Sequence, residues 1–138
     1  MITAGLTNSF KEQLLLGQHD LETDTLKMAL YTSSAVLGPA TTVYTSAGEV
    51  SSAGYTAGGE ILVNVTVNLS NGVAYASFDN PTWIATTFSP RGALIYNASK
   101  SNKSIGVLNF GIDQTTLSQS FQVQLGPNTP DSALIRII

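Results

Sequence analysis

The residues best suited to catalysis lie in one short segment, around the single histidine of the chain. His19 is followed by Asp20, and a histidine beside a carboxylate is half of a general-base arrangement in hydrolytic enzymes. The other half, a serine in a G-x-S-x-G turn, does not occur in the sequence. We therefore expect His19 to form local hydrogen bonds after a helix, and we expect no enzymatic activity.

Three carboxylates alternate along the next residues, at Asp20, Glu22 and Asp24. Such a run is similar to the first half of a calcium-binding loop. The sixth position of that loop needs glycine and the twelfth needs a bidentate glutamate, but the chain has Thr25 and Tyr31 there. We expect a polar turn in which Asp24 caps the backbone, and no metal or other cofactor.

The remaining polar residues form no motif for chemistry. The chain has no cysteine, which excludes disulfides, thiolate metal sites and cysteine nucleophiles. Four sparse carboxylates, any two of which would be needed for glycoside hydrolysis, are Glu49, Glu60, Asp79 and Asp113. Nothing in the sequence places two of them together. Arg91 stands before an apolar strand, where it is expected to clamp a loop or to reach across a subunit boundary.

The elements that position these residues begin with one short helix. Asn8 or Ser9 can cap it, Glu12 follows Ser9 at capping-box spacing, and Gly17 can end it. Phe10 and Leu14 fall on one face. A helix this short must pack on its own sheet or on a neighbouring subunit.

The rest of the chain alternates apolar and polar residues with the period of β-strands. The predicted strands are 25–32, 41–45, 61–69, 73–78, 83–87, 93–97, 105–110, 121–125 and 133–138. The pattern is clearest over 61–69, and Asn71-Gly72 then predicts a two-residue hairpin turn. Many short strands separated by turns indicate an all-β fold, a jelly-roll-like antiparallel β-sandwich.

The expected organisation is an N-terminal arm with the helix, residues 1–18, and one sandwich domain, residues 19–138. The stretch 46–59 is rich in Gly, Ser and Ala and predicts an irregular excursion of the kind that carries contacts. The apolar N-terminal stretch is too short to cross a membrane and too mixed for a secretory signal.

The surface chemistry is unusual, because only 11% of the residues are charged, against roughly 25% in ordinary soluble domains. A surface of hydroxyl and amide groups costs less to dehydrate than a charged one. This composition is compatible with a plain soluble β domain and equally with a protein that works pressed against neighbours, and we adopt the second interpretation. The net charge of −3, with six scattered Lys and Arg, excludes a basic patch for nucleic acid.

Several segments together resemble a family of small structural proteins from tailed bacteriophages. These segments are 10–17, 19–20, 24–32, 35–38, 41–44, 49–50, 54–59, 91–97, 107–111 and 133–137. Leu21 and Leu26 stand where phenylalanine is common in that family, and Ser89-Pro90 replaces a Thr-Ala-like pair. The size and sandwich fold are similar to capsid decoration, or cement, proteins.

The resemblance implies a virion protein without catalytic residues. It would be a homotrimer on the outer capsid surface that binds the major capsid protein. Expected contact regions are 1–16 and 46–59, with Phe10, Leu14, Tyr44, Tyr55 and Arg91 as candidate contact residues. A second hypothesis is a carbohydrate-binding module of a tail or fibre, which would present Trp83 and tyrosines in a groove.

Overall fold

The computed structural model describes residues 1–125, 129 and 133–137. They form two layers of antiparallel strands with one short helix, which confirms the all-β, sandwich-like fold. The elements are β1 (Gly5–Leu6), α1 (Asn8–Leu15), β2 (Leu26–Tyr31), β3 (Glu60–Ile61), β4 (Thr66–Ser70), β5 (Val73–Ser77), β6 (Thr82–Thr86), β7 (Gly92–Asn97), β8 (Lys103–Asn109), β9 (Gln119–Gln122) and β10 (Ile135–Ile137).

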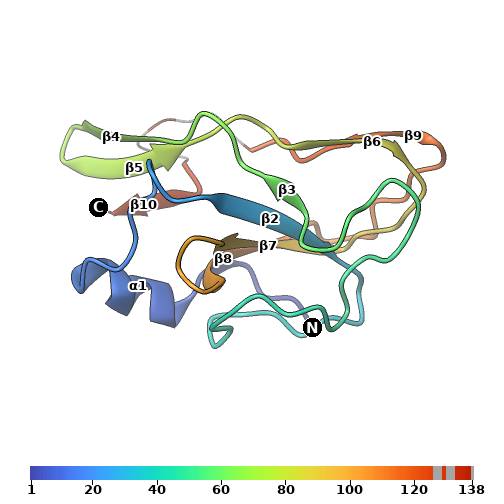
Figure 1. The fold of residues 1–138 in the computed structure, drawn as a ribbon, viewed down its shortest axis with the longest axis horizontal. Coiled ribbons are helices and arrows are strands. Elements are labelled where there is room, and N and C mark those ends of the chain that lie inside the picture. Colours follow the sequence, from blue (N-terminus) through green and yellow to red (C-terminus); the bar gives the residue numbers. More distant parts are fainter. Residues whose placement is uncertain (126–128, 130–132, 138) are drawn as a thin grey trace.

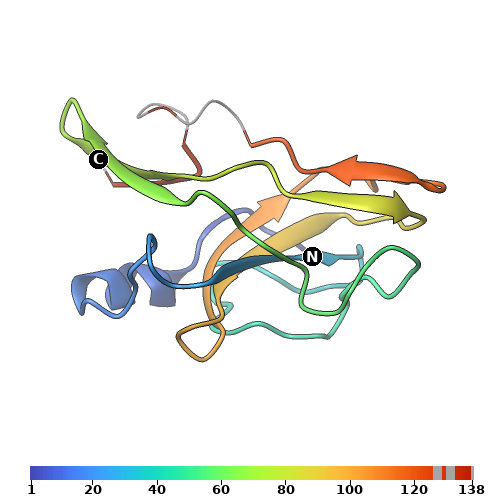
Figure 2. The ribbon, with the colours of Figure 1, turned by 45° about the horizontal axis from the view of Figure 1, so that its top comes forward.

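One layer is a five-stranded sheet with the order β1-β8-β7-β2-β3, and the other holds two smaller sheets, β10-β5-β4 and β6-β9. Figures 1 and 2 show the smaller sheets side by side above the larger one, with β4, β5 and β10 at one end of the long axis and β6 and β9 at the other. The main core fills the space between the layers.

Strand β2 lies inside the five-stranded sheet and is buried on both faces. Leu26, Met28 and Leu30 face the main core, as the alternation predicts. Ala29 and Tyr31 point to the opposite face, where they pack in a second apolar cluster. That cluster includes Ala35 and Leu37 of the segment between β2 and β3, so this irregular segment covers the outer face of the sheet.

The expected continuous strand over residues 61–69 is wrong. The chain leaves the larger sheet after β3 and enters the smaller sheet at β4. Between them Asn64 has a left-handed φ of 55°, a conformation that asparagine tolerates better than most residues. Its amide donates to Asp79 Oδ2 at 2.6 Å, and Asp79 N donates to the Val63 carbonyl oxygen at 3.0 Å. The apolar alternation of residues 61–69 therefore continues although the chain passes from the five-stranded sheet to the three-stranded one.

The hairpin at Asn71-Gly72 is confirmed. Strands β4 and β5 pair in register up to Ser70 opposite Val73, and the two turn residues have φ values of 51° and 79°. These positive values fit a type I′ turn, whose twist matches that of the flanking strands.

The N-terminal segment packs against the strands of its own chain. Strand β1 pairs with β8, and Phe10 of α1 is fully buried in the main core. The helix begins at Asn8, after the extended residue Thr7, so neither Asn8 nor Ser9 caps it. The Thr7 hydroxyl instead accepts a hydrogen bond from Ser104 Oγ at 3.0 Å.

Other strand boundaries differ by a few residues. Residues 41–45 form only an isolated bridge between Val43 and Lys103. The strand expected at 121–125 lies at 119–122 and that expected at 133–138 lies at 135–137; residue 138 lies outside the described residues. The sequence pattern missed β1, because two residues are too few to show alternation.

Candidate assembly surface

The helix end, the β4–β5 hairpin and the end of β10 carry exposed apolar side chains. Leu15 and Leu16 are 91% and 63% exposed, Leu69 is 78% exposed and Ile137 is 56% exposed. All four lie at the end of the sandwich where Figure 1 places α1, β4, β5 and β10. Exposed apolar side chains gathered in one region mark interaction sites more often than scattered ones do.

This end is open because the sheet β10-β5-β4 extends beyond the side chains that cover its inner face. Ala76 and Ile135 are paired and buried on the inner face of the sheet. Two residues further along, the paired Ala74 and Ile137 are on the same face, as is Leu69 opposite Ala74. These positions lie past the covering layer, so the inner apolar face of the sheet continues into solvent.

A groove of about 520 Å³ runs between this overhanging face and the segment that follows α1. Its apolar wall is formed by Leu14, Leu21, Val67, Ala74, Ile135 and Ile137. Its polar margin contains Asp20, Glu22 and Arg136. The groove thus offers an aliphatic wall, and its charged margin has more carboxylates than cationic groups, which is suited to an apolar chain.

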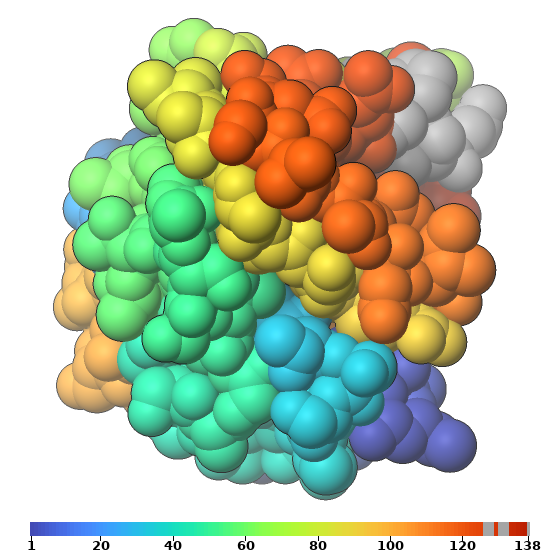
Figure 3. Space-filling view, turned by 90° about the vertical axis from the view of Figure 1, so that its right-hand side faces the viewer, coloured from blue at the N-terminus to red at the C-terminus, as the bar shows by residue number. Residues whose placement is uncertain are grey.

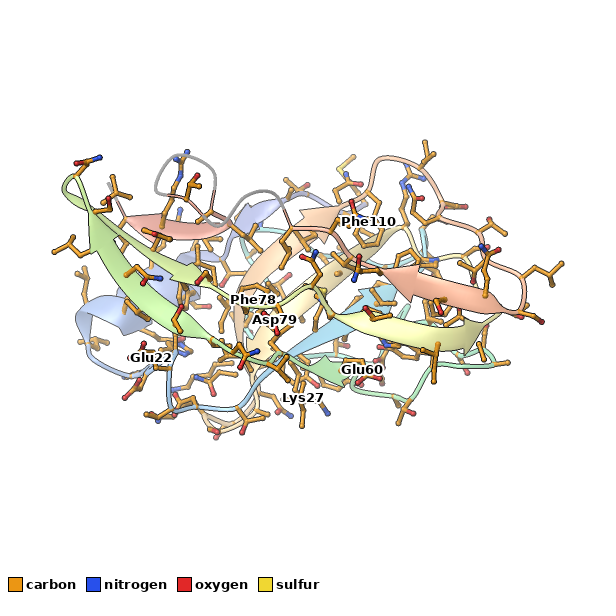
Figure 4. The ribbon with its side chains drawn as sticks, turned by 90° about the horizontal axis from the view of Figure 1, so that it is seen from above. Glu22, Lys27, Glu60, Phe78, Asp79 and Phe110 are labelled. Atoms are coloured by element: carbon orange, nitrogen blue, oxygen red, sulfur yellow. The ribbon has the colours of Figure 1, made fainter. Side chains whose placement is uncertain are left out.

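Glu22, at the margin of the groove, makes a hydrogen bond to the edge strand of the smaller sheet. Its Oε2 accepts a hydrogen bond from Val67 N of β4 at 3.0 Å, and Figure 4 shows Glu22 beside the β4–β5 hairpin. Strand β4 is at the edge of its sheet, where unpaired backbone groups can recruit another strand. The Glu22 carboxylate accepts a hydrogen bond from one of these backbone groups, Val67 N.

The histidine beside the groove belongs to a hydrogen-bond network that reaches three segments. His19 Nε2 lies 2.8 Å from Gln13 Oε1, and His19 Nδ1 lies 3.0 Å from Asn97 Nδ2. Asn97 Nδ2 also donates to Asp24 Oδ2 at 2.8 Å. A neutral His19 that carries its proton on Nε2 satisfies all these contacts.

Burial lowers the pKa of His19, and the nearby Lys103 charge lowers this pKa further. Burial alone would raise the pKa of Asp24, but its hydrogen bonds, from Asn97, Asp20 N and Lys100, bring this pKa below the ordinary value. Lys100 Nζ lies 3.1 Å from Asp24 Oδ1. The expected local role of Asp24 is confirmed, since Asp20 N donates to its Oδ2 at 3.0 Å.

A second polar cluster fixes the segment between β2 and β3. Glu49 accepts hydrogen bonds from Tyr44 Oη at 2.6 Å, from Tyr55 Oη, and from Gly58 N at 2.8 Å. Tyr96 Oη of β7 donates to the Gly58 carbonyl oxygen at 2.6 Å. Burial and the Glu49 carboxylate raise the pKa of both Tyr44 and Tyr55 well above the ordinary value. The cluster stabilises a loop, as all three Glu49 donors come from the loop itself.

Figure 3 shows the opposite end of the molecule, where β6 and β9 lie above the segment between β2 and β3. Ile84 and Leu117 are exposed in this region. Arg91 Nη1 lies 3.5 Å from Asp113 Oδ1, a carboxylate of the loop between β8 and β9.

The structure separates the predicted contact residues. Phe10 is fully buried and cannot touch a neighbouring subunit, so that expectation is wrong. Leu14 is half-buried in the groove wall. Tyr44 and Tyr55 meet at Glu49, and Arg91 lies apart from them. Leu15 and Leu16 lie within the expected contact region 1–16 but were not singled out, although three consecutive leucines, which one helix face cannot bury together, were a signal for them. Leu69 was missed.

The described residues contain no cluster of three His, Asp or Glu side chains placed to hold a metal ion. Glu49, Asp79 and Asp113 have different partners, namely tyrosines, Asn64 and Arg91.

All aromatic side chains lie in the described part of the chain, and each of them is buried or half-buried. Trp83 is among the buried ones, so it is not available to line a sugar-binding groove.

No family model, curated protein or solved structure matches this chain. Among the described residues, no helix has the length and apolar character needed to cross a membrane.

Proposed function

We propose that this protein is a decoration, or cement, protein of a tailed-bacteriophage capsid. It binds the outer surface of the assembled shell and stabilises contacts between major capsid protein subunits, and it does so as a homotrimer. No catalytic step belongs to this function.

The observation that carries the proposal is the open end of the sandwich. An uncovered groove and two leucines that are 91% and 63% exposed are costly on a protein that works alone, because apolar surface gains roughly 25 cal/mol per Å² when it leaves water. The low charge of the chain supports the same conclusion, since a hydroxyl- and amide-covered surface is easily dehydrated. The bacteriophage setting is supported by the sequence resemblance.

The mechanism is mechanical. A trimer that touches several capsid subunits at once converts weak single contacts into strong overall binding, because every contact after the first is intramolecular. Binding only to the assembled shell then stabilises that shell by mass action.

Co-sedimentation with capsids tests the proposal. The purified protein is mixed with undecorated capsids and, as a matched control, with capsids that already carry their decoration protein. We expect saturable co-sedimentation with the first and little with the second. Absence of binding to undecorated capsids, or binding only to host polysaccharide, would contradict the proposed function.

A further inference from the structure

Arg91 carries a guanidinium whose hydrogen-bonding capacity is largely unused. A guanidinium has five N–H donors in a planar fork. Among the described residues its side-chain partner is Asp113, which Nη1 meets at 3.5 Å, a long distance for such a bond. Arg91 Nε is buried and has no hydrogen-bond partner in the described part of the chain, a destabilising state for a polar group. The guanidinium is therefore held weakly and lacks acceptors.

A recess of about 460 Å³ lies beside this cation. It is lined by Met1, Ile2, Ser33, Arg91 and Asn109, and Figure 3 shows the first residues of the chain next to the segment that follows β2. Arg91 is the only charged side chain among the lining residues. The Asn109 amide is already used, since its Nδ2 donates to the Ile2 carbonyl oxygen at 2.9 Å and its Oδ1 accepts from a backbone amide. Ser33 is exposed and adds a hydroxyl donor.

The charges around the recess favour a ligand with one negative charge. The guanidinium already faces the exposed carboxylate of Asp113, and Met1 N is bonded to the Ala35 carbonyl oxygen at 3.0 Å. A doubly charged phosphate would need further side-chain cations to offset its charge, and the lining residues supply none besides Arg91. A carboxylate matches the planar fork with two parallel hydrogen bonds, so it is the anion that fits this recess best.

We propose that Arg91 and Ser33 form a carboxylate-binding site, and that its occupant is an aspartate or glutamate side chain of the major capsid protein. Entry of the carboxylate draws the guanidinium from Asp113 and gives the unpartnered Nε an acceptor. The occupant rests on the proposed function, whereas the site itself can be tested without a capsid. The recess shares no lining residue with the groove beside α1, so one copy can use both surfaces at once.

NMR spectroscopy tests the site first, with sodium acetate as the probe. The chain has two arginines, Arg91 and Arg136, so their Nε–H signals can be told apart. We expect the Arg91 Nε–H and Ser33 N–H signals to shift saturably, with half-saturation on the order of millimolar acetate. Sodium chloride at equal ionic strength should give no saturable shift, and phosphate should bind more weakly than acetate. Asp113→Asn removes the competing carboxylate and should tighten acetate binding about threefold.

Matched variants assign the acetate response to Arg91. Arg91→Gln should abolish the saturable shift of Ser33 N–H. Lys11→Gln removes the same charge from an exposed side chain of α1 and should leave the shift unchanged. Circular dichroism checks that the variants are folded. No saturable shift with acetate, an unchanged Ser33 response in Arg91→Gln, or tighter binding of phosphate than of acetate would overturn the site.

Co-sedimentation with undecorated capsids then tests the occupant. We expect Arg91→Gln to weaken capsid binding at least about tenfold, because it removes one partner of a charge pair that binding buries. Asp113→Asn breaks the same intramolecular ion pair but should bind capsids at least as tightly as the wild type. Equal losses in these two variants, or no loss in Arg91→Gln, would overturn the capsid carboxylate as occupant. Wild-type protein that binds acetate but no capsid would reject the proposed function only, and capsid binding without an acetate response would reject this site only.

Discussion

At the scale of single residues, Glu49 is the polar group with the most demanding surroundings. Its carboxylate accepts from two tyrosine hydroxyls and one backbone amide. All three donors lie on the loop that covers the outer face of the larger sheet. A carboxylate satisfied in this way fixes the path of a loop that has no regular strand pairing.

Replacing Glu49 with glutamine places an amino group where a carboxylate oxygen accepts hydrogen bonds. We expect Glu49→Gln to lower the free energy of unfolding by about 2–3 kcal/mol, since hydrogen bonds to charged groups contribute more than neutral ones. Urea unfolding measures the change. Glu60→Gln, on an exposed side chain, is the control and should change stability by less than about 0.5 kcal/mol. Equal losses would show that Glu49 has no special role.

His19 makes stability depend on pH. Burial and Lys103 lower the pKa of His19 in the folded protein, while the unfolded chain titrates near 6.5. Below about pH 6.5 the unfolded state therefore binds more protons, and stability falls as the pH falls. Protonation also places a hydrogen on Nδ1, against the amide of Asn97.

We expect the urea midpoint of the wild-type protein to drop between pH 7.5 and pH 5.5, and the His19→Gln protein to show a smaller drop. The lowered pKa of Asp24 acts in a more acidic window, so it does not confuse the comparison. An identical pH dependence in both proteins would contradict the neutral His19 described here.

The sequence predicted part of this residue-level picture. Hydrogen bonding of His19 close to the helix was predictable, and Gln13 provides it. The contact with Asn97 was not, because 78 positions separate the two residues and no motif links them. Phe10 was assigned to a contact surface together with the rest of residues 1–16, but its helical face packs into the core.

At the scale of elements, Gly59 sets how closely the covering loop approaches β2. A Cβ at Gly59 would lie 1.8 Å from the Met28 carbonyl oxygen, a distance that backbone atoms cannot tolerate. Gly111 has nearly the same φ, +83° against +81°, and nothing within 4 Å of a Cβ. The two glycines therefore separate the effect of a backbone clash from that of a left-handed conformation.

We expect Gly111→Ala to cost about 1–2 kcal/mol, which is the penalty for a left-handed L-residue. Gly59→Ala should cost a further 1–3 kcal/mol from the overpacking. Chemical denaturation of both variants gives the comparison. Equal losses would mean that the loop moves away from β2 without resistance.

The elements themselves were largely predictable where one face is covered by a sheet. Alternation placed Leu26, Met28 and Leu30 in the core, and Asn71-Gly72 at the hairpin. It failed at residues 61–69, because period two records which face is apolar but not which sheet the strand belongs to. Only the left-handed Asn64 marks the crossing, and asparagine is too common in this chain for that signal to stand out.

At the scale of the whole molecule, composition predicted the polar, weakly charged exterior, while the open groove depended on tertiary structure. Its wall combines residues from α1, β4, β5 and β10 with the segment after the helix. No local pattern shows that the smaller sheet extends past its covering layer. The end of the molecule that we assign to assembly therefore became visible only in the fold.

A protein that works bound to a shell should be more stable there. When free capsid sites exceed the dissociation constant a hundredfold, binding adds about 2.7 kcal/mol to the apparent stability. We expect differential scanning calorimetry to show a higher unfolding temperature for the protein mixed with undecorated capsids than for the protein alone, and the shift should grow with capsid concentration. A shift of the same size with pre-decorated capsids would point to a nonspecific effect.

The central claim is that this weakly charged molecule works covered by copies of itself and by a viral shell. The most direct measurement is a cryo-EM map of the virion that contains this chain. We expect density for the sandwich on the outer capsid surface, with the end formed by α1, β4, β5 and β10 against neighbouring copies. Density in the tail or fibres, or a capsid-bound monomer whose groove faces solvent, would contradict it.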